Sequence, residues 1–83
     1  MINSYPSLDL HGEYVDSAIF LTKEFINDNI FLKNEFVCII HGIGSDTLRK
    51  AVHDYLRHEK MVDSYKRDFI NPGVTIVKLN IKN

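Results

Sequence analysis

Two short stretches of this chain place histidine and glycine at the ends of apolar runs. The first is LDLHG at residues 8–12, and the second is IIHGIGSD at residues 39–46. Asp9 and His11 stand two residues apart, so on a strand their side chains share one face. An imidazole can accept or return a proton near neutral pH, and a neighbouring carboxylate can orient or stabilise it. The spacing predicts acid–base chemistry, or a divalent metal that activates water.

The second stretch is typical of a turn that opens a helix beside an anion. Gly42 and Gly44 allow the backbone to approach a ligand closely. The free N–H groups of Gly44, Ser45 and Asp46 would point at that ligand, with the positive end of the helix behind them. The sequence therefore predicts a phosphate-binding turn.

Hydrophobic periodicity predicts the elements that position these residues. Apolar residues from Val15 onward recur at helical spacing, and the helix should end within residues 27–29, whose residue types favour turns. A continuous apolar run over 35–40 suits a strand buried on both faces. The full expected order is a strand over 7–11, the first helix, the strand over 35–40, a helix that opens at the glycine turn, and strands over 61–69 and 74–81.

This βαβαββ order predicts an α/β fold, a two-layer sandwich with a four-stranded mixed sheet and two helices on one face. The first two strands should be parallel, and the last two should form an antiparallel hairpin around a turn at 71–73. In open α/β sheets ligands bind beyond the carboxyl ends of the strands. If the first two strands are neighbours, His11 and His41 should meet there as a pair.

The quoted residues resemble a known family. LDLHG, HGIGSDTLR and the closing NPGVTIV are similar to the two signature motifs and the final strand of Smr (small MutS-related) domains, over about residues 7–81 of a single domain at 1–83. The resemblance implies a nucleic-acid-binding domain that cleaves RNA, notably messenger RNA on ribosomes, or nicks DNA. It assigns Asp9 and His11 to cleavage, and Gly42 and Gly44 to nucleic-acid contact.

The other expected site residues belong to the same motifs. Gly12, Ile43 and Ser45 would contact nucleic acid at the two turns. Arg49 and Lys50 fall in the first turns of the second helix, where cations suit a phosphate better than they suit the helix dipole. Many relatives carry Lys or Arg at the position of Ile43, so this turn should hold phosphate more weakly.

Two routes to cleavage stay open. In the first, RNA supplies its own 2′-OH nucleophile, His11 and His41 move the protons, Asp9 orients one of them, and no cofactor is required. In the second, Asp9 and a histidine hold Mg²⁺ or Mn²⁺, which activates water. The alternative function is a module that binds nucleic acid or a ribosome without catalysis. An enzyme for a small phosphorylated ligand would need a deeper pocket than this short chain offers.

Composition and charge limit the classes of protein to which this chain can belong. The net charge is −1 and the pI about 6.4, a weak footprint for a nucleic-acid binder, so that function must depend on a local site. The single cysteine, Cys38, lies in an apolar run and should be buried and inert. Without a targeting signal or an apolar run long enough to span a bilayer, the sequence favours a cytoplasmic protein with no membrane partner. His53 and His58 are expected on the surface, and no oligomeric state is predicted.

Overall fold

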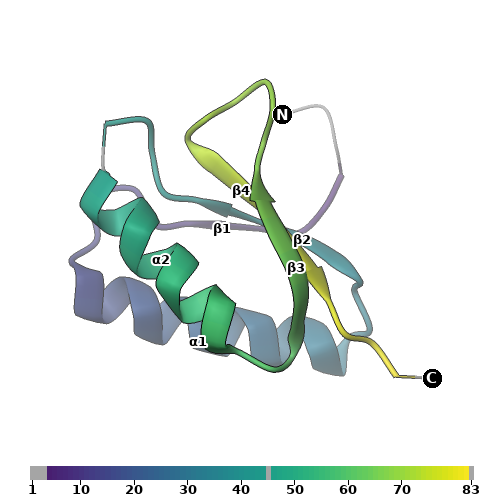
Figure 1. The fold of residues 1–83 in the computed structure, drawn as a ribbon. Helices are drawn as coiled ribbons and strands as arrows, with labels where there is room; N and C mark the ends of the chain where they lie inside the picture. The colour runs from purple at the N-terminus through teal and green to yellow at the C-terminus, as the bar shows by residue number, and fades with distance from the viewer. Residues whose placement is uncertain (1–3, 45, 83) are drawn as a thin grey trace.

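The computed structural model describes residues 4–44 and 46–82. Both helices of this part lie on the same side of one sheet (Figure 1), which confirms the predicted α/β two-layer sandwich. The elements follow in the order β1 (Ser7–Asp9), α1 (Val15–Phe31), β2 (Phe36–Ile40), α2 (Asp46–His58), β3 (Val62–Arg67) and β4 (Val74–Leu79). Neither helix is long and apolar enough to cross a membrane within these residues.

The sheet has the strand order β1-β2-β4-β3. β1 pairs with β2 in parallel, and β4 is antiparallel to both β2 and β3. The predicted parallel first pair and the antiparallel hairpin are therefore confirmed. Because β4 lies between β2 and β3, the hairpin loop at 68–73 is brought beside the end of β2.

The first helix continues beyond its predicted end. The sequence places that end within residues 27–29, but α1 runs to Phe31. Asn29 is buried, its Nδ2 donates to the Phe25 carbonyl at 2.8 Å, and its Oδ1 accepts from Asn34 Nδ2 at 2.9 Å. Since both ends of this amide have partners, the helix accommodates Asn29 instead of stopping there. Lys33, with a φ of 61°, makes the left-handed turn beyond the helix.

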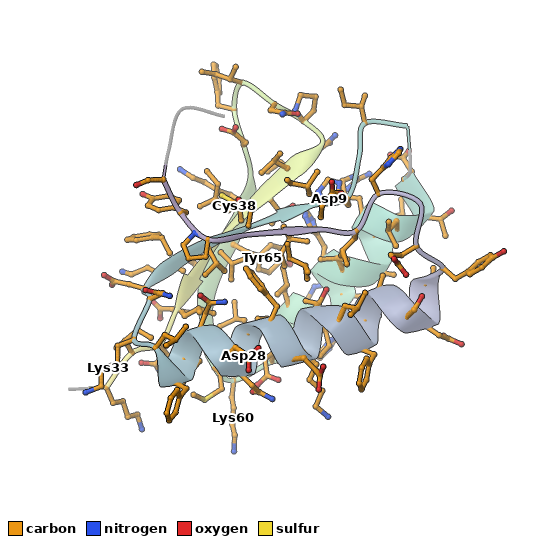
Figure 2. The ribbon with its side chains drawn as sticks, turned by 180° about the vertical axis from the view of Figure 1, so that it is seen from behind. Asp9, Asp28, Lys33, Cys38, Lys60 and Tyr65 are labelled. Atoms are coloured by element: carbon orange, nitrogen blue, oxygen red, sulfur yellow. The ribbon has the colours of Figure 1, made fainter. Side chains whose placement is uncertain are left out.

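Alternation along the strands gives the sheet two different faces. The core against the helices is built from strand residues Leu8, Leu10, Val37, Ile39, Val77 and Leu79, together with apolar residues of α1 and α2. Asp9 pairs with Ile40, which pairs with Val74, so these three side chains share the other side of the sheet. We call this side, which neither described helix covers, the open face. In Figure 2, Asp9 points away from α1, whereas Tyr65 lies between the sheet and that helix.

Candidate active site

A pocket of about 330 Å³ lies on the open face, at the carboxyl ends of β1 and β2. The loops after both strands and the β3–β4 hairpin contribute to it, and its lining residues are Asp9, His11, Ile40, Gly42, Ile43, Asn71 and Gly73. Asp9 and His11 are both exposed to solvent. The expectation that these two side chains share one face is therefore confirmed, and both line the same pocket.

The Asp9 carboxylate shapes the chain at the end of β1. Its Oδ1 accepts a hydrogen bond from the backbone N–H of His11 at 2.9 Å. Gly12 continues the turn with a φ of 84°, a left-handed conformation that glycine adopts without strain. An ionised carboxylate has about four lone-pair sites. Asp9 therefore keeps acceptor capacity for a ligand or for an imidazolium.

His41 does not join His11 in this pocket. Because Ile40 shares the open face with Asp9, the next residue along the chain projects to the helix side. His41 is accordingly 1% exposed. The expected His11–His41 pair is thus wrong as geometry, since His41 does not line the pocket and its ring contacts Thr75 and His53 on the helix side of the sheet. Of the described residues that line the pocket, His11 alone carries an imidazole.

His41 instead belongs to a buried hydrogen-bonded chain. Its Nε2 lies 2.8 Å from Thr75 Oγ1, and His53 Nε2 lies 2.7 Å from the same oxygen. His41 Nδ1 faces the Gly42 carbonyl at 3.3 Å, and a carbonyl only accepts, so this nitrogen carries the proton. In the neutral ring Nε2 then accepts from the Thr75 hydroxyl, and Thr75 accepts from His53 Nε2–H. One tautomer of each histidine satisfies the whole chain.

His53 is therefore not the surface residue that the sequence predicts. It is half-buried, and its ring packs edge-on to His41 at 5.9 Å and against Tyr65 at 5.0 Å, measured between ring centroids. The residue lies off the apolar stripe of α2, but Thr75 of β4 and Tyr65 of β3 contact its side chain. His58, by contrast, is exposed as expected.

Burial and neighbouring cations keep both histidines neutral. Burial lowers the pKa of His53 to about 4, with further lowering from the charges of His41, Arg49, Arg67 and Arg57. Burial also lowers the pKa of His41; the hydrogen bond to Gly42 opposes this, and Arg49 and Arg67 add to it. The neutral chain derived above is therefore the form present at neutral pH.

The stability of the domain should fall as the pH drops from about 6.5 to about 4. In that window the unfolded chain binds a proton at His53 while the folded chain does not, and the lowered pKa of His41 acts in the same direction, so acid favours unfolding. Each pKa unit corresponds to about 1.4 kcal/mol, and partial exposure of His53 reduces the expected loss to roughly 2 kcal/mol. Urea unfolding at a series of pH values measures it. A wild-type curve that is flat over this window would contradict the buried neutral chain.

A glycine pair joins the end of β2 to the hairpin. The Gly73 carbonyl accepts from the backbone N–H of His41 at 3.0 Å and of Gly42 at 3.1 Å. Gly42 has a φ of 90°. A Cβ on Gly73 would lie 3.1 Å from the Gly42 carbonyl carbon and from the backbone nitrogen of Ile43. The sequence marks Gly73 only as part of a turn, whereas the structure makes it one wall of the pocket.

Gly73→Ala should therefore destabilise the domain by about 1–3 kcal/mol, the usual cost of overpacking. At roughly 4–8 °C per kcal/mol for a domain of this size, Tm should fall by about 5–20 °C. Gly44→Ala is the matched control, because a Cβ there would meet no atom within 4 Å. Thermal unfolding of the Gly73→Ala and Gly44→Ala variants measures the difference in Tm. Equal Tm values would show that the junction tolerates a methyl group.

The remaining predicted contacts surround the same turn. Ile43, Gly44 and Lys50 are exposed there, while Ser45 lies outside the described residues. Arg49 pairs with an acidic residue of the same helix: its Nη2 lies 3.2 Å from Asp46 Oδ1, and its side chain is 20% exposed. Its Nε is buried and has no hydrogen-bond partner among the described residues. The charge of Arg49 lowers the pKa of both His41 and His53, so the guanidinium lies close to these two rings.

Asp9 and His11 do not form part of a larger metal-binding cluster. Among residues 4–44 and 46–82, no group of three or more His, Cys, Asp or Glu side chains could hold a metal ion. Two protein donors are fewer than the three or four that zinc sites use.

Comparison with known proteins places the chain in a family. The family model for the Smr domain matches residues 8–80. The chain belongs to the Smr domain family. This Smr domain is 39% identical over 77 residues to Endonuclease MutS2 of Symbiobacterium thermophilum, and 36% identical over 80 residues to Endonuclease MutS2 of Lactobacillus helveticus. The matches cover 89% and 93% of this chain but 10% of each relative, so the chain spans about a tenth of their length.

Solved structures share the fold of this Smr domain. The Smr domain of Thermus thermophilus MutS2 superposes with a TM-score of 0.88 at 28% identity, covering 90% of this chain and 98% of that one. YdaL, a stand-alone small MutS-related protein from Escherichia coli, gives a TM-score of 0.86 at 24% identity, over 94% of this chain and 66% of its own. The family resemblance read from the two motifs is thereby confirmed.

Proposed function

We propose that this Smr domain binds RNA and cleaves it as an endonuclease, with His11 as general base and Asp9 as its partner. One observation carries the proposal: an exposed imidazole and an exposed carboxylate line one open pocket beside a glycine turn. The relatives named Endonuclease MutS2 add support for nuclease chemistry. The ribosome as a partner and a cytoplasmic location stay predictions.

The proposed reaction is a transesterification within the RNA strand. His11 takes the proton of a 2′-OH as that oxygen attacks the adjacent phosphorus. The bond from phosphorus to the 5′ oxygen of the next nucleotide breaks, and that oxygen takes a proton from water. The products are a 2′,3′-cyclic phosphate and a 5′-hydroxyl end. The negative charge of Asp9 favours the imidazolium that forms on His11.

RNA suits these residues better than DNA does. DNA has no 2′-OH, so its cleavage requires an activated water, a task that nucleases commonly give to two metal ions. The pocket supplies one imidazole and one carboxylate, enough for proton transfer to an internal nucleophile. The N-terminal end of α2 follows the glycine turn directly and adds a partial positive charge for phosphate.

A second function, binding without cleavage, is favoured by one observation. Ile43 stands exposed at the turn where a cation would strengthen phosphate contact, and the net charge of the chain is −1. Each phosphate contact adds to the salt-dependent part of affinity. A module that uses few such contacts should bind with a shallow salt dependence.

Comparison of two strands of one sequence tests the cleavage proposal. An unstructured RNA strand and its fully 2′-O-methylated copy are incubated with the domain in EDTA. The proposal expects both to bind and only the RNA to be cut, with cyclic phosphate ends. If the methylated strand is cleaved, or if DNA is cleaved only when Mg²⁺ is added, the nucleophile is an activated water and the proposed 2′-OH mechanism is wrong. If both strands bind and neither is cleaved, the second function, binding without cleavage, is the one supported.

A further inference from the structure

Three large apolar side chains stand in solvent around the pocket. Ile43 is 73% exposed, Ile70 77% and Phe69 99%. Ile43 belongs to the loop after β2, and the other two belong to the β3–β4 loop, which also supplies Asn71 and Gly73 to the pocket wall. A lone exposed apolar side chain is ordinary, but a group of them at the pocket that holds Asp9 and His11 marks a binding surface.

Strand register places Phe69 along the same edge as His11. Asp9, Ile40 and Val74 lie side by side across β1, β2 and β4, and Asp68 N donates to Val74 O at 2.8 Å, which extends the row to the fourth strand. Three strand spacings of about 4.8 Å separate Asp9 from Asp68, or about 14 Å. Phe69 follows Asp68 directly. An extended strand of a few nucleotides covers this distance.

Hydrogen bonds fix the loop that presents Phe69. Arg67 Nε and Nη2 both donate to the Pro72 carbonyl at 3.3 Å. Gly73 N donates to Asn71 Oδ1 at 3.1 Å, and the Gly73 carbonyl is held by the end of β2 as described above. The aromatic ring therefore stands on an anchored loop, which lowers the entropy that a ligand must pay to order it.

We propose that Phe69, flanked by Ile70, is a stacking platform for an unpaired base of the strand whose phosphate lies at the Asp9–His11 pocket. Aromatic side chains hold single-stranded nucleic acid by stacking, which contributes about 1–3 kcal/mol per base. The inference rests on the proposed function and extends it: the substrate is single-stranded on the hairpin side of the cut, and Phe69 sets that preference.

Charge around the loop fits a nucleotide better than an apolar protein partner. Lys66, exposed on β3 next to the loop, makes no ion pair with any residue in the described ranges. Arg67 lies exposed at the end of the same strand. A nucleotide brings a flat base and a phosphate together, so the Phe69 ring and the Lys66 ammonium group each have a partner. In a paired duplex the base faces are already stacked, and Phe69 would find none.

A tryptophan reporter tests the contact directly. The sequence has no tryptophan, so Phe69→Trp provides a single fluorophore at the proposed platform. The 2′-O-methylated single strand, which the proposed reaction cannot cut, should quench it strongly. A copy with abasic nucleotides should quench it weakly, because no base is present to stack. Phe31→Trp, at an 84% exposed position at the far end of α1, is the matched control and should stay unquenched.

Binding and kinetics of Phe69 variants complete the test. Phe69→Ala should weaken binding of the methylated strand by about 5- to 150-fold, the equivalent of one stacked base, and Phe69→Tyr should restore it. KM for RNA should rise while kcat stays unchanged, because Phe69 does not touch the reacting phosphate. Phe31→Ala should bind and cleave as the wild type does.

Several results would overturn the platform. The platform would be contradicted if Phe69→Ala binds the methylated strand as tightly as the wild type does. It would also be contradicted if the abasic strand quenches the Phe69→Trp variant as strongly as the complete strand does. Either result holds even if cleavage is normal. A blue shift of the Phe69→Trp emission with rising protein concentration would show that a second copy covers the loop. If the wild type binds and stacks but never cleaves RNA, the proposed function fails and the platform stands.

Discussion

The His11→Ala variant is expected to cleave RNA roughly 10²- to 10⁴-fold more slowly than the wild-type domain, the range that a general base contributes. His11 supplies the imidazole of the pocket, and the buried His41 lies on the other side of the sheet and cannot take its place. The measurement is the single-turnover rate on a labelled unstructured RNA in EDTA. Binding of the methylated strand should change little, since the backbone of the glycine turn remains.

His58→Ala is the control for this result. His58 is an exposed histidine on α2 outside the pocket, and its removal should leave the rate unchanged. Thermal unfolding of His11→Ala should match that of the wild type, because the side chain it loses is exposed. A His11→Ala variant that keeps its fold and its full cleavage rate would move the general base elsewhere.

Thr75→Val is expected to have the largest effect on stability, a loss of about 2–4 kcal/mol. The hydroxyl of Thr75 is the link between His41 and His53, and valine would leave one acceptor nitrogen and one N–H group without a partner. An unsatisfied buried polar group costs about 1–3 kcal/mol. The midpoint of urea unfolding measures the loss.

Thr22→Val is the control that separates the loss of the histidine chain from the general effect of replacing a buried threonine by valine. Both threonines are 0% exposed, but the Thr22 hydroxyl donates only to the Ala18 carbonyl within α1. Its loss should cost less than 1 kcal/mol, the lower end of what a single hydrogen bond contributes. Equal midpoints for the two variants would mean that the histidine chain contributes nothing to stability.

The sequence predicts the elements and the open-face half of the site, because each depends on local pattern. Period-2 and period-3.6 spacing place the helices and strands, and the spacing of Asp9 and His11 settles that both lie on one face. The apolar run around Cys38 predicts its burial, which the structure confirms.

What the sequence does not predict depends on strand order. Nothing local places β4 between β2 and β3, yet that position brings Thr75 to His41, 34 residues away, and carries the hairpin to the pocket. His53 looks like a surface residue for the same reason, since its partners come from β3 and β4. The His11–His41 pair fails because the end of β1 is level with Ile40, one residue before the histidine.

Amide chemical shifts on adding the 2′-O-methylated strand to the ¹⁵N-labelled domain test the central claim most directly. The account predicts that shift changes concentrate at the open-face edge, at Asp9 to Gly12, Gly42 to Gly44 and the 68–73 loop. The ring nitrogen signals of His11 should shift as well. Shifts confined to the groove between α1 and α2, lined by Val15, Ile19, Tyr55 and His58, would contradict it and place the nucleic-acid interface on the opposite side of the molecule.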